Sequence, residues 1–380
     1  MLKIVVTGDF CPIYNSGGIT KGAAYKDMFG DFPDTIKGKD IHITNLECPI
    51  TSRTETIPKY GPVLRATPET IKALKYTLVD VACLANNHIL DFGNQGLFDT
   101  INLCKKNGIR TVGAGKNLSE ASEVLYLTVK NKNIAIINIT QHEFSIALEE
   151  RAGANPLNIV QNYYSIIEAR KHSKIALVIV HGGNEEYHLP SRRIVDTYRF
   201  FADIGASAVI SHHSHCISGY EIFNGVPIFY GLGNFIFDRS VTVVPDTWFT
   251  GLILFLNIDD SDKITFELKP FFQSKKGLGF KLLDGSDKVA VMKEIDLYSG
   301  VIKDSQKLQH YWNKFSEESR HYYYTKLVGL GTIRRKLYRI PFLQKWLFPI
   351  KRKAVLYDMV KCEAHNDVIS DLLLKDLTKK

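Results

Sequence analysis

Short apolar runs recur along the first two thirds of the chain, and each ends abruptly in polar residues or glycine. Runs of this length and composition are typical of buried strands, and the better-capped segments between them predict helices. Strands are predicted at residues 2–9, 40–47, 79–85, 110–112, 134–139, 175–180, 208–210, 227–235 and 251–256, and helices at 69–76, 94–106, 158–172 and 191–203. The alternation of strand and helix predicts an α/β sandwich whose sheet is parallel at its centre.

This alternation stops near residue 280. The remaining residues have mostly helical patterns and stretches in which aromatic residues are interleaved with Lys and Arg. We therefore predict two parts, an α/β domain over residues 1–280 and a mostly helical, basic-aromatic C-terminal extension over residues 281–380.

Potential ligands stand at the ends of five predicted strands. They are Asp9, Asn45 with Glu47, Asn87 with His88, His181, and His213 with His215. A single polar residue after a strand more often caps a turn or forms an ordinary hydrogen bond than binds a metal. Together, however, these residues place carboxylate, carboxamide and imidazole groups at one edge of one sheet. Mixed nitrogen and oxygen ligands suit Mn, Fe or Zn, so we expect one or two divalent metal ions.

The same motifs, in this order, resemble the CapA family of capsule and poly-γ-glutamate synthesis proteins. The motifs are Thr7-Gly8-Asp9, Asn45-Leu46-Glu47, Asn86-Asn87-His88 with Asp91, His181-Gly182-Gly183 with Glu185, His212-His213-Ser214-His215 and Leu232-Gly233-Asn234-Phe235. That family is similar to the calcineurin-like metallophosphoesterases. The resemblance covers residues 2–260 and implies a four-layer calcineurin-like metallophosphoesterase sandwich with a dinuclear metal centre.

The resemblance also implies a role for each matching residue. The metal ligands would be Asp9, Glu47, Asn87, His181, His213 and His215, the catalytic residues His88 and Asp91, and the substrate-binding residues Arg65 and Asn234. Glu47 would lie between two cations, which would clamp a phosphoryl oxygen and activate water for attack. His88 would protonate the leaving oxygen, and Asp91 would orient His88. Whether His212 replaces His213 as the ligand stays open.

Two motifs depart from the superfamily pattern. Its first motif is Asp-x-His, where this chain has Asp9-Phe10-Cys11, and its Gly-Asp-x-x-Asp motif is replaced by Asn45-Leu46-Glu47. Cys11 is either a ligand or simply packed. Both changes weaken the first metal site, so a single-metal centre or one of low activity is an alternative.

Charge and cysteine content bear on partners and compartment. The formal net charge is +8, and residues 326–353 contain basic but no acidic residues. Such a segment either makes a peripheral contact with a membrane or with the capsule machinery, or forms a helical cap that packs Trp346 and Phe348 on the main domain. The six cysteines lack paired spacing, and neither a signal peptide nor an apolar run of about 18 residues occurs, so we expect a cytoplasmic protein.

Three functions remain open. The favoured one is a metal-dependent phosphoesterase-like hydrolase in capsule or surface polysaccharide synthesis, acting on an anionic or phosphorylated glycan or polymer and not on nucleic acid. The second is a non-catalytic scaffold of a capsule polymerase or export complex. The third is a polymer-modifying enzyme acting on amide or glycosyl-phosphate bonds.

Overall fold

The structure is a computed structural model that describes residues 1–13, 28–237, 246–273, 279–327, 340, 343 and 348–378. The chain divides into two compact units, Met1–Leu308 and Gln309–Lys380, and each is described by itself. Most of the basic segment at residues 326–353, including Trp346, lies outside the described residues. The packing predicted for Trp346 therefore stays a prediction.

The first sheet of the Met1–Leu308 unit has eight strands. In order across the sheet they are β16 (Lys281–Leu282), β15 (Ile264–Phe272), β14 (Thr250–Ile258), β1 (Leu2–Cys11), β2 (Ile41–Leu46), β3 (Val81–Cys83) and β4 (Arg110–Val112), and β13 (Asn234–Phe237) also pairs with β1. Strands β1 to β4 are parallel, whereas β14 and β15 are antiparallel neighbours. The predicted parallel centre is confirmed.

The second sheet has six strands. In order they are β11 (Tyr220–Phe223), β12 (Val226–Phe229), β10 (Ala208–His212), β9 (Ile175–His181), β7 (Lys132–Thr140) and β6 (Leu125–Val129). Strands β12, β10, β9 and β7 are parallel, and the edge strands β11 and β6 form antiparallel hairpins with their neighbours. The continuous apolar sequences of β9 and β10 follow from burial of both faces of this sheet.

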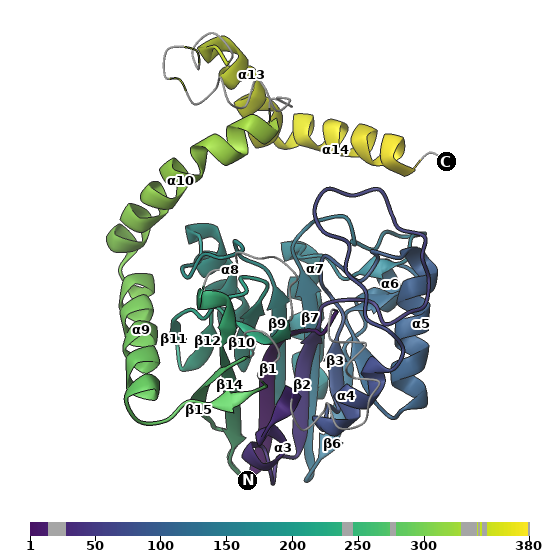
Figure 1. The fold of residues 1–380 in the computed structure, drawn as a ribbon, viewed down its shortest axis with the longest axis vertical. Helices are drawn as coiled ribbons and strands as arrows, with labels where there is room; N and C mark the ends of the chain where they lie inside the picture. Colours follow the sequence, from purple (N-terminus) through teal and green to yellow (C-terminus); the bar gives the residue numbers. More distant parts are fainter. Residues whose placement is uncertain are drawn as a thin grey trace. The chain divides into compact units, whose positions relative to one another are not determined.

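The two sheets pack face to face and helices cover their outer faces (Figure 1). The inner core joins Ile4 of β1 and Ile43 of β2 to Leu177 of β9 and Ile210 of β10. Helices α4 (Thr70–Tyr76) and α5 (Gly93–Lys106) pack on the first sheet, and α7 (Ile159–His172) and α8 (Arg192–Asp203) on the second. This arrangement has four layers, and it confirms the predicted α/β sandwich.

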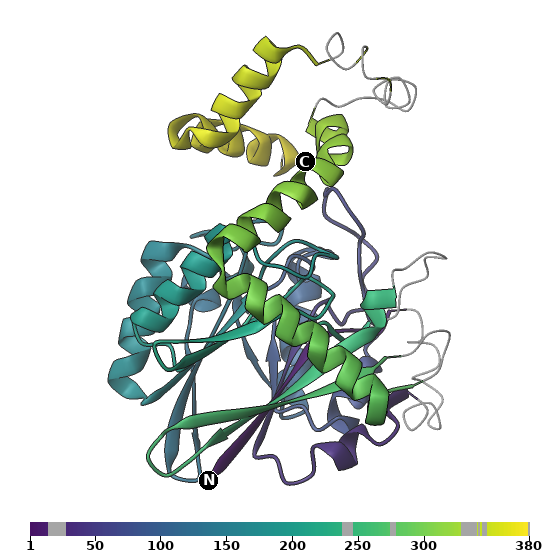
Figure 2. The same ribbon diagram turned by 90° about the vertical axis from the view of Figure 1, so that its left-hand side faces the viewer.

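Smaller elements complete this unit. They are α3 (Phe32–Thr35), β5 (Ala114–Gly115), α6 (Leu118–Ala121), β8 (Gly153–Ala154), the 3-10 helix η1 (Asp246–Phe249) and α9 (Gly285–Lys303). Helix α9 packs against β15 of the first sheet and β11 of the second (Figure 2). At β11 the hydroxyl of Ser299 accepts a hydrogen bond from the amide of Tyr220 at 2.9 Å. The compact unit thus includes a helix beyond residue 280, where the sequence pattern places the domain boundary.

The C-terminal segment is helical, as predicted. Helix α10 (Ser305–Leu327) begins in the first unit and continues into the second, which also contains α13 (Ile350–Lys361) and α14 (Glu363–Thr378). Phe348 is buried, and its ring packs edge-on against the ring of Tyr324 with 5.2 Å between the ring centroids. None of the described helices combines the length and the apolar content that a membrane span requires.

Candidate metal centre

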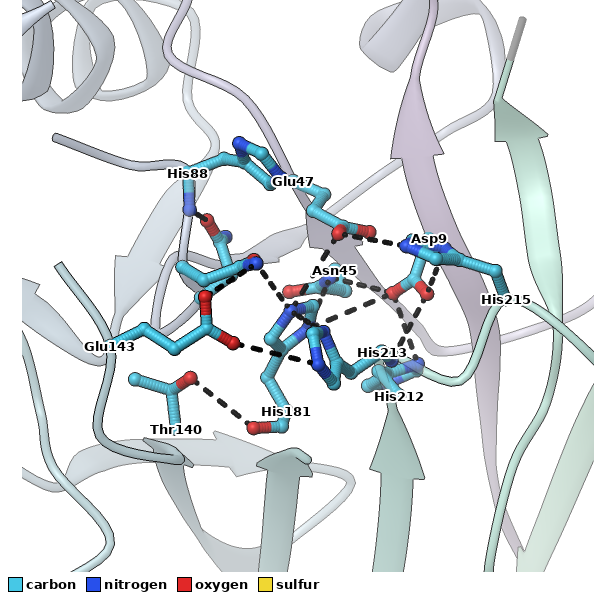
Figure 3. Close-up of polar contacts among 12 residues, drawn as sticks. Asp9, Asn45, Glu47, His88, Thr140, Glu143, His181, His212, His213 and His215 are labelled. Carbon is cyan, nitrogen blue, oxygen red and sulfur yellow. Dashed lines mark hydrogen bonds and ion pairs between the residues drawn. The ribbon is translucent and has the colours of Figure 1, made fainter. Parts of the chain in front are cut away.

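Four strands deliver polar side chains to one edge of the sandwich. Asp9 lies in β1 and Asn45 in β2, with Glu47 just beyond its end, while His181 and His212 are the last residues of β9 and β10. Asp9 is in register with Asn45, and His181 with His212. Asp9 and Asn45 belong to the first sheet and the two histidines to the second, whereas the sequence pattern predicts a single sheet. Because the carboxyl ends of the parallel strands of both sheets meet at one edge of the sandwich, residues distant in sequence converge there (Figure 3).

A glycine permits the close approach that brings β13 beside Asp9. A Cβ atom at Gly8 would lie 1.9 Å from the carbonyl oxygen of Gly233, and the amide of Asp9 donates to that same oxygen at 3.3 Å. A residue with a side chain would not fit at this position. The strand register then pairs Asp9 with Asn234.

Four donor atoms converge near the end of β9, and we call their residues, Glu47, Asn87, His181 and His213, the second donor group. The Nε2 atom of His181 lies 3.0 Å from Nδ1 of His213 and 3.1 Å from Oδ1 of Asn87. Oε1 of Glu47 lies 3.6 Å from the same Nε2. Two imidazoles, an amide oxygen and a carboxylate form a donor set that suits a borderline divalent cation.

A neighbouring set shares Glu47, and we call Asp9, Glu47 and His215 the first donor group. The Nε2 atom of His215 lies 3.4 Å from Oε1 of Glu47, and its Nδ1 lies 3.4 Å from Oδ2 of Asp9. In each group, the histidine nitrogens and carboxylate oxygens that could bind a metal all lie within 4.8 Å of one another. This distance does not include the amide oxygen of Asn87. Glu47 therefore occupies the shared position that the resemblance implies for it.

The loop after β10 holds two of these histidines in an uncommon backbone conformation. His213 has φ 88° and His215 has φ 54°, a region that residues other than glycine rarely adopt. Such residues cost roughly 1–3 kcal/mol each and cluster at functional sites. The surrounding packing thus holds both rings toward the donor groups.

The bonding state of Glu47 provides a test of whether a cation fits. Glu47 is fully buried, and among the described residues neither of its carboxylate oxygens has a hydrogen-bond partner. The imidazoles of His215 and His181 lie 3.4 and 3.6 Å from its Oε1 without forming a hydrogen bond. A buried carboxylate without a hydrogen bond is unfavourable unless it is neutralised or binds a metal. The residues present therefore fit a divalent cation at each donor group.

The protonation tendencies of Asp9 and His181 agree with this fit, whereas the pKa of His215 is raised, because the lowering by burial is outweighed by hydrogen bonding to Asp9 together with the nearby negative charges. Burial and the neighbouring charge of Asp9 raise the pKa of Glu47 well above its ordinary value. Burial alone would also raise the pKa of Asp9, but hydrogen bonding to His215 and the adjacent imidazoles lower it. Burial and the neighbouring His213 hold the pKa of His181 well below its ordinary value, so His181 is neutral and keeps a lone pair for a cation.

His88 belongs to a separate buried group beside Asn87. Its Nδ1 atom lies 2.6 Å from Oδ2 of Asp91, and Oδ1 of Asp91 accepts from Nζ of Lys59 at 2.6 Å. Lys59 also lies 3.3 Å from Nδ1 of His88, and its side chain is only 3% exposed. Burial lowers the pKa of His88, although Asp91 opposes this effect. Asp91 is thus placed to orient His88.

Two residues predicted to bind substrate have other contacts. The guanidinium of Arg65 donates to the carbonyl oxygen of Arg53 and lies 5.0 Å over the ring of Phe92. Asn234 is buried, and its Oδ1 lies 2.9 Å from Nδ1 of His215. The structure therefore does not bring Arg65 into the donor groups, and it places Asn234 as a support for His215.

The structure distinguishes between residues that the sequence left open. His213, and not His212, joins the second donor group, whereas His212 has its Nδ1 3.8 Å from Oδ1 of Asp9. Cys11, at the place of the superfamily's first-motif histidine, packs in the apolar core on the outer face of the first sheet. Among the described residues, the motif that begins with Asp9 therefore contributes no further ligand to the first donor group.

Two residues at this site were missed in the sequence. Glu143 follows β7 and contacts both Asn87 and His213, and Lys59 lies in an irregular segment. The position of Glu143 just after a strand is the signal that could have found it. No sequence signal singles out Lys59.

The chain matches the family model described as "Bacterial capsule synthesis protein PGA_cap" over residues 3–239, which is more than half of its length. The chain belongs to this family. The predicted resemblance to CapA proteins is confirmed, and the match spans all the residues of both donor groups.

Individual relatives are similar over part of their length. The chain is 31% identical over 233 residues to the PGA biosynthesis protein CapA of Bacillus subtilis, covering 60% of this chain and 61% of the relative. It is 32% identical over 213 residues to a probable polyglutamine synthesis accessory protein of Mycobacterium tuberculosis, covering 52% and 56%. The chain thus spans less than two thirds of each of these relatives.

A solved structure of a putative 5'-nucleotidase from Staphylococcus aureus is also similar. It has a TM-score of 0.45 and 13% identity, and the similarity covers 77% of this chain and 58% of that one. At this score the similarity supports no argument about the site.

Proposed function

We propose that this member of the family is a metal-dependent hydrolase of phosphate esters that serves the synthesis of a capsule or another surface polymer. The observation that supports the proposal is the buried carboxylate of Glu47, which is shared by two donor groups and has no hydrogen-bond partner among the described residues. Asp9, Glu47 and His215 would hold one divalent cation, and Glu47, Asn87, His181 and His213 a second. The metal would be Mn, Fe or Zn, because the donors are nitrogen and oxygen atoms.

When bound, divalent cations supply Lewis acidity, which polarises a phosphoryl oxygen and lowers the pKa of water. The chain supplies the proton of the leaving group. Nδ1 of His88 is occupied by Asp91, so Nε2 is the atom that exchanges a proton with substrate. Lys59 holds Asp91 from the other side and keeps this pair in place.

The names of the family and of its relatives support a proposal for the substrate class. The family description names capsule synthesis, and the Bacillus relative is named for PGA biosynthesis. We therefore propose an anionic or phosphorylated glycan or polymer as substrate. A polymer amide or glycosyl-phosphate bond remains the alternative target of the same centre.

A second candidate is a non-catalytic accessory role in a polymer synthesis or export complex. Two observations favour it. The Mycobacterium relative is named as an accessory protein, and Cys11 packs in the core where the superfamily has a histidine ligand. In this case the donor groups would hold metal for structural reasons.

Hydrolysis of a chromogenic phosphodiester separates the two candidates. The assay uses the full chain loaded with Mn²⁺ or Zn²⁺, beside His88→Asn, which leaves both donor groups intact. We expect turnover by the wild type, and a loss of about 100-fold or more in kcat with unchanged metal content in the variant. Stoichiometric metal without turnover of phosphodiester, amide or glycosyl-phosphate substrates would refute the hydrolase and support the accessory role.

We propose a peripheral membrane contact for the C-terminal unit, in a protein of the cytoplasm. Helix α13 carries Lys351, Arg352 and Lys353 beside exposed Ile350 and Val355. Basic and apolar residues together favour an anionic lipid surface. Replacing the three basic residues by Glu in the full chain should abolish co-sedimentation with vesicles containing phosphatidylserine, and unchanged co-sedimentation would contradict the contact.

A further inference from the structure

Glu143, in the loop that follows β7, lies outside every motif that identifies the family. We propose that Glu143 is a positioning residue, whose carboxylate holds Asn87 and His213 with their ligand atoms directed into the second donor group. The inference rests on the proposed metal centre and deepens it, because it explains how two ligands acquire the orientation that a cation requires.

One carboxylate contacts both ligands through different oxygens. Oε2 of Glu143 accepts a hydrogen bond from Nδ2 of Asn87 at 3.1 Å, and Oε1 lies 3.6 Å from Nε2 of His213. The opposite atoms of the two ligands, Oδ1 of Asn87 and Nδ1 of His213, face Nε2 of His181 at 3.1 and 3.0 Å. Figure 3 shows Glu143 on the outer side of His213, away from Glu47.

The chemistry of each ligand allows one productive and one unproductive orientation. An ionised carboxylate only accepts hydrogen bonds, so Asn87 must direct its amide nitrogen to Glu143 and its oxygen inward. The negative charge of Glu143, with Oε1 3.6 Å from Nε2 of His213, favours the proton on that nitrogen and leaves the lone pair on Nδ1. A flipped amide, or the other imidazole tautomer, would present N–H groups to the cation and could not bind it.

The first donor group contains a comparable support. Oδ1 of Asn234 lies 2.9 Å from Nδ1 of His215, and Nε2 of His215 is then directed toward Glu47. Metal-binding imidazoles commonly have such a partner on their other ring nitrogen, and its loss typically weakens metal affinity about 10–100-fold. Glu143 differs because it controls two ligands at once.

Glu143→Gln tests the inference while keeping the size of the side chain. Glutamine has one acceptor oxygen and one amino group, so it can hold only one of the two ligands in the productive orientation. We expect the affinity of the second site for Zn²⁺ to fall about 10–100-fold, measured by titrating metal-free protein against a chromogenic chelator. Glu143 and Glu149 are both exposed, but of the two only Glu143 contacts Asn87 and His213, so Glu149→Gln, the same charge change in the same segment, should leave the affinity unchanged.

The tautomer of His213 gives a second measurement that needs neither metal nor activity. In ¹⁵N-histidine-labelled, metal-free protein, long-range ¹H–¹⁵N spectra distinguish Nε2–H from Nδ1–H, and the signal is assigned by its absence from His213→Asn. We expect Nε2–H in the wild type and a shift toward Nδ1–H in Glu143→Gln. A wild-type signal dominated by Nδ1–H would overturn the inference.

The two measurements separate this inference from the proposed function. A folded wild type that binds no Zn²⁺ would refute the metal centre, and the tautomer would still decide the positioning role. A wild type that binds Zn²⁺ beside a Glu143→Gln variant of equal affinity would refute the positioning role and leave the centre standing. Thermal unfolding of both proteins verifies that the variant is folded.

Discussion

Replacing Glu47 by glutamine is expected to stabilise the metal-free protein and to destabilise the metal-loaded one. In the metal-free state the Glu47 carboxylate is buried beside Asp9, and among the described residues its oxygens have no hydrogen-bond partner. A buried polar group without a partner costs about 1–3 kcal/mol. Glutamine keeps the shape and removes both the charge and the repulsion from Asp9, so we expect the unfolding free energy in EDTA to rise by about 1–2 kcal/mol.

The pH dependence of this difference has a definite sign. The pKa of Glu47 is raised in the folded protein, so between its ordinary value of 4.5 and the folded value the folded state binds more protons than the unfolded state. The stability contributed by this proton is present below pH 4.5 and is lost as the pH rises toward the folded pKa. The advantage of Glu47→Gln in EDTA should therefore grow with pH through this window.

Metal reverses the order of stability. A ligand that binds only the folded state stabilises it by about 4 kcal/mol at a free concentration of roughly 1,000 times its dissociation constant. The wild type should gain this amount in Mn²⁺ or Zn²⁺ and Glu47→Gln should lose most of it, because both donor groups share the residue. Urea unfolding followed by circular dichroism measures both effects, with Glu149→Gln as the exposed control. A variant that is less stable in EDTA and equally stabilised by metal would refute the reasoning.

Three further predictions follow from other buried groups. Burial lowers the pKa of His42 to about 3, so the wild type should lose about 2 kcal/mol of stability between pH 7 and pH 5 from this residue. His42→Asn should show a correspondingly smaller loss in urea unfolding, and an identical loss would contradict the assignment. Lys59→Met leaves Asp91 buried without its cation and should lower the unfolding free energy by about 3 kcal/mol, whereas a change below about 1 kcal/mol would contradict a buried ion pair. Asn234→Ala should weaken one Zn²⁺ site about 10–100-fold in chelator competition, because His215 loses its support, and unchanged affinity would show that the ring is held otherwise.

The strands and the convergence of most of the candidate ligands could be predicted because two regularities act together. An apolar run marks each buried strand, and the carboxyl ends of parallel strands meet at one edge. Asp9, Glu47, His181 and His215 follow from these two facts and from the order of motifs, and the structure brings them together. The choice between His212 and His213 depends on the backbone conformation of the loop after β10, and the hydrophobic pattern of the sequence does not predict that conformation.

The residues that sequence reasoning missed act through contacts between distant segments. Lys59 reaches Asp91 from an irregular segment, and Glu143, after β7, reaches His213, after β10, across the one strand between them, β9. The predicted boundary lies near residue 280, whereas the compact unit ends at Leu308. The sequence of α9 predicts a helix but does not show that this helix packs on β11 and β15, which places it in the first unit. The role predicted for Arg65 stays a prediction.

The metal content of the purified chain tests the central claim most directly. Inductively coupled plasma mass spectrometry on the metal-loaded wild type, His213→Ala and Asp9→Ala compares one variant for each donor group. We expect about two ions per chain in the wild type and about one in each variant, because Asp9 belongs only to the first donor group defined above and His213 only to the second. A well-folded wild type that retains no metal after loading would contradict the account.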